Sequence, residues 1–193
     1  MNRFCTLALL LPLLLGRAEA QTEPKPAKLY EMATEGNPVA LEILTTLADT
    51  GNAEAQLNLG WIYHDGFVVA QNTRLALQLF TKAAEQGLSD AQFWLGWMYD
   101  IGEGVRKDSA AAIPWFKKAA EQGDRDAQYT LGLKYRDGTG IAKDPIAAYV
   151  WLSLAASQGD RFAEKARNDL QTSMPPADLA EAQKLVAEWK PKH

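Results

Sequence analysis

The sequence predicts an all-α protein built as an α-solenoid, a row of paired helices, because one unit of 36 residues recurs along the chain. Four columns keep this step: Gly60, Gly96 and Gly132; Gly66, Gly102 and Gly138; Tyr63, Tyr99 and Tyr135; and Gln56, Gln92 and Gln128. The block Ala-Ala-Glu-Gln-Gly at 83–87 returns at 119–123 and, with Ser for Glu, at 155–159. A fixed period of this size is the signature of stacked structural repeats.

Each full unit is expected to contain two helices joined by a loop. The full repeats cover about 51–86, 87–122 and 123–158, within an array at 30–173 that has a degenerate repeat at each end. The first helices are predicted at about 53–64, 89–100 and 125–136, and the second helices at about 73–86, 109–122 and 145–158.

Capping residues mark the ends of these helices. We expect side-chain N-caps at Asn52, Ser89 and Asp124 for the first helices, and at Asn72, Asp108 and Asp144 for the second helices. Gly66, Gly102 and Gly138 are predicted to end the first helices as C-cap glycines. The loop of the first repeat differs from the others, since Val68 stands where they have a second glycine.

A mid-helix glycine indicates a close approach between helices. Gly60, Gly96 and Gly132 each cost about 1 kcal/mol of helix propensity relative to Ala, so packing must offset the loss. Alanine and tyrosine columns on the first helix, and alanine and aromatic columns on the second, suit such packing. We therefore expect the glycine column to face the partner helix.

The two ends of the chain lie outside the repeat pattern. Residues 1–20 carry Arg3, a short apolar run and Ala18-Glu19-Ala20, which predicts a secretory signal peptide cleaved after Ala20. The expected location is the periplasm, with secretion as the alternative. Residues 21–29 read as a flexible spacer, and the helices that follow are either an N-terminal cap or a degenerate repeat. Residues 174–193 are predicted to form a C-terminal capping helix and tail.

These motifs resemble the Sel1-like repeat family, relatives of the tetratricopeptide repeats with a longer loop between the two helices. The resemblance rests on Ala-Gln-x-x-Leu-Gly-x-x-Tyr at 91–99, Gly-x-Gly-Val at 102–105 and the Ala-Ala-Glu-Gln-Gly blocks. It implies a right-handed α-solenoid that serves as a protein-binding scaffold. A cysteine-rich branch of the family is linked with β-lactamase activity, but the only cysteine here is Cys5, within the predicted signal peptide.

Composition and motifs favour binding over catalysis. The net charge of −4 gives no reason to expect nucleic acid or stable membrane insertion. The two histidines, His64 and His193, have no companion at metal-ligand spacing, and no catalytic constellation is present, so we expect no cofactor, no metal and no enzymatic activity. The alternatives to a scaffold in the bacterial envelope are an immunity or regulatory protein with one partner and, less favoured, a cell-wall or β-lactam hydrolase. The sequence does not indicate an oligomeric state.

One stripe on the first helices is the candidate partner-binding surface. Its members are turned away from the alanine packing stripe, and the resemblance places them on the concave groove: Trp61, His64, Phe93, Trp97, Asp100, Tyr129, Leu133 and Arg136. Aromatic residues on a rigid scaffold are good anchors for a partner segment. The competing interpretation is that the column of Leu57, Phe93 and Tyr129 packs adjacent repeats together, and Trp94, one position away, is either a surface or an inter-repeat residue.

Overall fold

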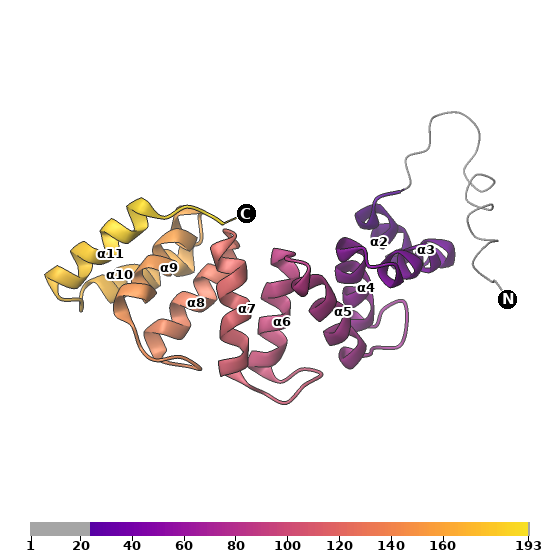
Figure 1. Cartoon of the computed structure of the whole chain (residues 1–193), viewed down its shortest axis with the longest axis horizontal. Coiled ribbons are helices and arrows are strands. Elements are labelled where there is room, and N and C mark those ends of the chain that lie inside the picture. The colour runs from indigo at the N-terminus through magenta and orange to yellow at the C-terminus, as the bar shows by residue number, and fades with distance from the viewer. Residues whose placement is uncertain (1–23, 193) are drawn as a thin grey trace.

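The computed structural model describes residues 24–192, which form ten α-helices and no strands (Figure 1). The helices are α2 (Pro26–Thr34), α3 (Pro38–Asp49), α4 (Ala53–Asp65), α5 (Thr73–Glu85), α6 (Ser89–Ile101), α7 (Ser109–Glu121), α8 (Arg125–Asp137), α9 (Pro145–Ser157), α10 (Arg161–Gln171) and α11 (Pro176–Glu188). They follow one another in a single row, so the predicted α-solenoid is confirmed. The signal peptide predicted at residues 1–20 lies outside the described part of the chain.

The three full repeats are the helix pairs α4–α5, α6–α7 and α8–α9, and their boundaries follow the capping residues. Asn52 and Asp124 accept hydrogen bonds from helical backbone N–H groups, as do Asn72, Asp108 and Asp144. The glycines after α4, α6 and α8 all adopt the left-handed conformation. The N-cap predicted at Ser89 is wrong. Leu88 occupies the capping position of α6 and Ser89 is the first helical residue, because the 36-residue register aligns Leu88 with Asn52 and Asp124.

The mid-helix glycines lie against the second helix of their own repeat, as predicted. A Cβ atom added at Gly96 would lie 2.9 Å from the Phe116 ring, and one added at Gly60 would lie 2.7 Å from the Phe80 ring. Phe80 and Phe116 have no exposed surface, so neither ring has free space to move into.

The second glycine in the loops of the second and third repeats has a separate role in stacking the loops. Gly140 has a φ of +78°, and a Cβ atom there would collide with the backbone carbonyl of Ser109 in the preceding repeat. Gly104 makes the same approach to Thr73. In the first repeat Val68 takes this place and packs instead against the N-terminal core cluster. The Gly-x-Gly loops therefore depend on a full repeat before them.

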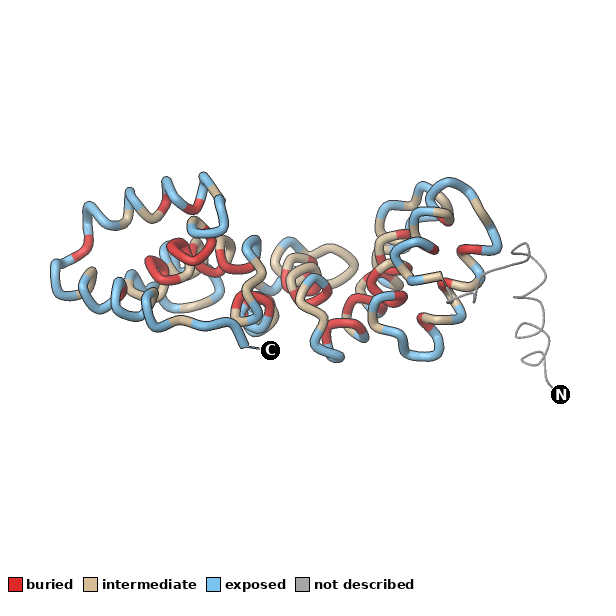
Figure 2. Tube along the Cα trace, turned by 90° about the horizontal axis from the view of Figure 1, so that it is seen from above, coloured by how far each residue is buried: buried red, intermediate tan, exposed pale blue. Residues whose placement is uncertain are grey.

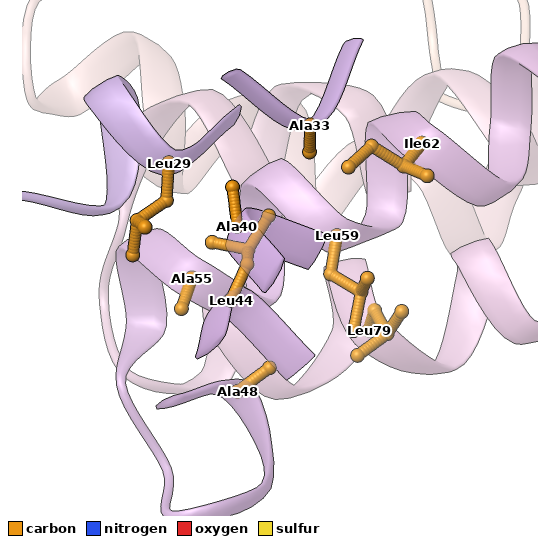
Figure 3. Close-up of a cluster of buried hydrophobic side chains, with 9 residues drawn as sticks. All are labelled: Leu29, Ala33, Ala40, Leu44, Ala48, Ala55, Leu59, Ile62 and Leu79. Carbon is orange, nitrogen blue, oxygen red and sulfur yellow. The ribbon is translucent and has the colours of Figure 1, made fainter. Parts of the chain in front are cut away.

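The N-terminal helix pair forms one core with the first repeat. Leu29 of α2, Leu44 of α3 and Leu59 of α4 are buried in the same cluster (Figure 3). The α3 helix ends in the register of α5 and α7, because Gln56 donates a hydrogen bond to its Ala48 carbonyl at 3.0 Å, as later glutamines do to later second helices. We infer that α3 is the second helix of a degenerate repeat. The spacer predicted at 21–29 ends earlier than expected, since Pro26, at the favoured first position, begins α2.

Buried glutamines join each repeat to the one before it. The side-chain amide of Gln92 donates to the Ala84 carbonyl at 3.1 Å, and its oxygen accepts from Gln122 at 2.8 Å. Gln128 makes the equivalent bonds to Ala120 and from Gln158. Because an unpaired buried amide is costly, these bonds fix the register between neighbouring repeats. We call this set the glutamine ladder: Gln56, Gln86, Gln92, Gln122, Gln128 and Gln158.

The C-terminal end departs from the repeat geometry. Like α6 and α8 in their repeats, α10 packs on the preceding second helix, but α11 packs mainly on α9 rather than on α10. It covers Tyr149, Val150 and Leu154, so the predicted capping helix shields the flank of α9. The tail then runs back to α7, where the Lys192 backbone N–H donates to the Glu121 carbonyl at 2.7 Å.

The core runs along the row as buried segments of successive helices, with exposed residues around them (Figure 2). Among the described residues, no helix combines the length and apolar character that a membrane span requires.

Candidate functional site

The candidate surface contains a cluster of aromatic side chains between α4 and α6. The ring centroid of Trp61 lies 4.5 Å from that of Trp94, and Trp94 lies 5.4 Å from Trp97. All three tryptophans are partly buried, and their rings meet edge to face, the arrangement that aromatic quadrupoles favour. The Trp61 ring also rests on buried Phe80, so the core supports the cluster. We call Trp61, His64, Phe93, Trp94 and Trp97 the aromatic cluster.

His64 connects this cluster to two carboxylates. Its ring contacts Trp61, with centroids 5.4 Å apart, while Nδ1 lies 2.8 Å from Asp65 and Nε2 lies 3.4 Å from Glu103. Glu103 belongs to the loop of the next repeat, so the imidazole spans the boundary between two repeats. The cluster therefore has an acidic margin beside its aromatic surface.

Asp100 forms an ion pair between repeats. Lys134 Nζ lies 2.6 Å from both carboxylate oxygens, and the side chains are 12% exposed for Lys134 and 19% for Asp100. Burial acts to raise the pKa of Asp100, but hydrogen bonds from Lys134 and Ser109 and the attraction of the Lys134 charge outweigh it, so the pKa lies below its ordinary value. The carboxylate of Asp100, which was predicted to contact a partner, is therefore already bonded to Lys134 within the chain.

We expect Asp100→Asn to lower the free energy of unfolding by about 1–2 kcal/mol at pH 7, because it leaves Lys134 without its counter-ion. The folded pKa of Asp100 is depressed, so the pair stabilises the protein above the ordinary value of 3.8 and is lost as the pH falls below it. Urea unfolding at pH 7 and at pH 3 measures this, and the difference between wild type and variant should shrink at pH 3.

The matched control is Asp126→Asn, which removes an exposed ion pair with Arg125. Because exposed ion pairs are screened by solvent, this control should leave the free energy of unfolding close to the wild-type value at either pH. Equal effects of the two substitutions at pH 7 would contradict a structural role for the Asp100–Lys134 pair.

The remaining predicted residues lie at different places in the array. Tyr129 and Leu133 pack against the cluster formed by α9 and α10. Phe93 belongs to the aromatic cluster, 5.2 Å from Trp94 between ring centroids, and also lies 5.8 Å from the core ring of Phe116. Leu57 is only 7% exposed. These contacts support the packing interpretation of that column. Arg136 is exposed and bonded to its neighbour Asp137, away from the aromatic cluster.

Sequence reasoning left Trp94 undecided, although its ring is at the centre of the cluster. The signal was its spacing to Trp97, because residues three apart share a helix face. The contact between Trp61 and Trp94 could not be predicted by comparing equivalent positions, because the equivalent of Trp61 is Trp97 and not Trp94.

Among the described residues, no group of three or more His, Cys, Asp or Glu side chains is placed to hold a metal ion. The arrangement presents aromatic rings, a histidine and carboxylates to a partner on one surface that two repeats share. Such a surface suits recognition of another protein segment.

The fold defines an all-α protein of the helical-repeat class. The chain belongs to the Sel1 repeat family, whose model matches residues 53–88, 89–124 and 125–160, the three full repeats. Repeats of this kind generally mediate protein–protein interaction. The comparison with curated proteins gives no match.

Solved structures of Sel1-type repeat proteins are similar to this chain. A Sel1 repeat protein from Oxalobacter formigenes is 42% identical, with a TM-score of 0.63, over 67% of this chain and 97% of that one. The protein c5321, a protective antigen of uropathogenic Escherichia coli, is 27% identical with a TM-score of 0.59, over 85% of this chain and 44% of its own. Cysteine-rich protein B of Helicobacter pylori, 21% identical with a TM-score of 0.52 over 72% and 95%, shares the fold.

Proposed function

We propose that the protein is an exported, non-catalytic scaffold that binds a segment of another protein on the first-helix surface, with the aromatic cluster as its main anchor. The observation that carries the proposal is the cluster itself: three partly buried tryptophans meet across a repeat boundary while their undersides rest on the core. A surface already held in place loses little conformational freedom on binding, which favours affinity.

Export is the part of the proposal that rests on sequence. The charged, apolar and small-residue regions of residues 1–20 have the order of a cleaved leader. The proposal therefore places the partner in the bacterial envelope, on the far side of the cytoplasmic membrane. Expression with the native N-terminus, followed by mass measurement of the protein from the periplasmic fraction, should give a chain that begins at Gln21.

A pull-down from envelope extract tests the binding surface. The bait is compared with a variant carrying Trp61→Ala and Trp97→Ala, and with Trp115→Ala as a control that removes a tryptophan of α7 outside the cluster. We expect at least one protein to be recovered about tenfold less by the double variant and undiminished by the control, since anchor residues carry much of the binding energy.

Circular dichroism must show the same helix content for all three baits. Because Trp61 rests on Phe80, Trp94→Gln serves as a second variant that leaves that contact in place. Equal recovery of every partner by folded cluster variants would contradict the assignment of the aromatic cluster as the binding site.

A further inference from the structure

A concave site separate from the aromatic cluster lies at the C-terminal end, where the repeat geometry stops. A cavity of about 360 Å³ opens between α10 and α11 above α9. The lining residues come from α9 (Tyr149, Ser153, Ala156, Ser157), α10 (Glu164, Arg167) and α11 (Gln183, Val186). Its volume falls in the lower part of the range typical of small-molecule sites, about 300–1,000 Å³. We call it the C-terminal cleft.

Two lining residues depart from the columns of the full repeats. Glu164 stands 36 residues after Gln128, in the column of the glutamine ladder, and Arg167 stands 36 residues after Leu131, in a column of buried leucines. In the full repeats these positions are buried and uncharged. In α10 they become a carboxylate and a guanidinium, both facing the cleft, because no second helix covers α10 as α9 covers α8.

The Glu164 carboxylate and the Arg167 guanidinium are only weakly paired with each other. Arg167 Nη2 lies 4.0 Å from the Glu164 carboxylate. Two bonds from Nε and Nη2 to the Asn168 side chain, at 3.2 and 2.9 Å, hold the guanidinium in place and leave its Nη1 donors open. The cleft thus offers a donor group and an acceptor group a short distance apart.

The wall formed by α9 contains a polar atom without a partner. Ser153 is 7% exposed, and its hydroxyl makes no hydrogen bond to the described residues. The equivalent hydroxyl two repeats earlier, Thr81, donates to the Leu77 carbonyl at 2.7 Å. A buried hydroxyl that leaves its local bond unmade, in the wall of a cavity, points to a partner from outside the chain.

We propose that the C-terminal cleft binds a small zwitterion of amino-acid or dipeptide size, with its carboxylate on Arg167 and its ammonium on Glu164. The guanidinium fork matches carboxylate geometry and Glu164 accepts from an ammonium group. Ala156 and Val186 supply an apolar wall for a side chain. The site is separate from the aromatic cluster, so either can be tested without the other.

The experiment uses the purified exported chain and a set of matched probes. Titration calorimetry with glycyl-L-leucine should give a dissociation constant of about 0.1 mM. N-acetylglycyl-L-leucine, which lacks the ammonium group, and glycyl-L-leucine amide, which lacks the carboxylate, should each bind about tenfold more weakly or worse. Free L-leucine, run beside them, distinguishes an amino-acid site from a dipeptide site. Backbone amide shifts in α9 and α10 locate the probe.

Two variants test the roles of Arg167 and Glu164 separately. Arg167→Gln should abolish discrimination against the amide, and Glu164→Gln should abolish discrimination against the acetylated probe, while both keep the wild-type melting curve. Arg161→Gln, on the exposed side of the same helix, is the control and should bind as wild type does. The proposal is overturned if neither leucine nor the dipeptide binds at about 10 mM, or if Arg167→Gln and Glu164→Gln leave the affinities unchanged.

Discussion

Gly96→Leu should lower the free energy of unfolding by about 3 kcal/mol, at the upper end of the usual cost of overpacking. A Cβ atom at this position would lie 2.9 Å from the Phe116 ring and 3.3 Å from the Ala112 carbonyl oxygen. Phe116 is fully buried, so α6 and α7 must separate to admit a leucine side chain. For a chain of this size the melting temperature should fall by roughly 6–12 °C, measured by circular dichroism.

Lys117→Leu is the matched control, because it introduces the same side chain at an exposed position of α7. Its effect should stay within about 0.5 kcal/mol. Gly96→Ala separates the two contributions at the glycine: better helix propensity favours the variant, but the Phe116 ring must still move. A Gly96→Leu protein that melts with wild type would contradict the close approach of the two helices.

The array could be predicted from the sequence because its signals are local. Asn72 and Asp108 cap helices through their own side chains, and Gly102 adopts a conformation that favours glycine, so each marks a boundary without knowledge of the fold. The 36-residue step then supplies the stacking partners. These are the features that a one-dimensional pattern contains.

The placement of α11 could not be predicted in the same way. Pro175 and Pro176 indicate a break in the chain but not the direction that the chain takes after it. The apolar pattern of α11 does not indicate which helix it covers, and only the structure shows that Tyr149 and Leu154 of α9 pack against it. The C-terminal cleft follows from that choice: the charges at Glu164 and Arg167 are visible in the sequence as departures from their columns, but the α11 wall that closes the cleft is not.

Only part of the candidate site could be predicted, because its contacts join different columns of neighbouring repeats. Trp61 and Trp97 belong to one column and could be selected together, whereas the contact that builds the cluster joins Trp61 to Trp94 across columns. Asp100 was selected as a surface charge, and its partner Lys134 comes from a column that the stripe did not include. Contacts between repeats depend on the rotation of one helix against the next, which the period alone does not give.

The second large effect concerns the glutamine ladder, where Gln128→Glu should lower the free energy of unfolding by about 3 kcal/mol at pH 7. Gln128 has no exposed surface, and its amide nitrogen lies 3.1 Å from the Ala120 carbonyl oxygen. A carboxylate has nearly the same shape but would put negative charge beside that oxygen, at a fully buried position. We expect burial to raise the pKa of the glutamate by about two units, and each unit costs about 1.4 kcal/mol at neutral pH.

The same substitution should become nearly harmless in acid. A protonated glutamate can donate to the Ala120 carbonyl and still accept from the Gln158 amide, as the native side chain does. Since the folded pKa is raised above the unfolded value, the loss of stability is present at neutral pH and disappears as the pH falls toward about 4. Urea unfolding at pH 7 and at pH 4 measures both states, with Gln78→Glu, exposed on α5, as the control.

The chain already contains the comparison that this prediction requires. Glu164 occupies the same column one repeat later, where its side chain is 59% exposed and borders the C-terminal cleft. The column carries a glutamate where water reaches it and a glutamine where the next ladder residue covers it. If Gln128→Glu were as stable as wild type at pH 7, burial would not be what distinguishes these positions, and the glutamine ladder would lose its role in setting the register between repeats.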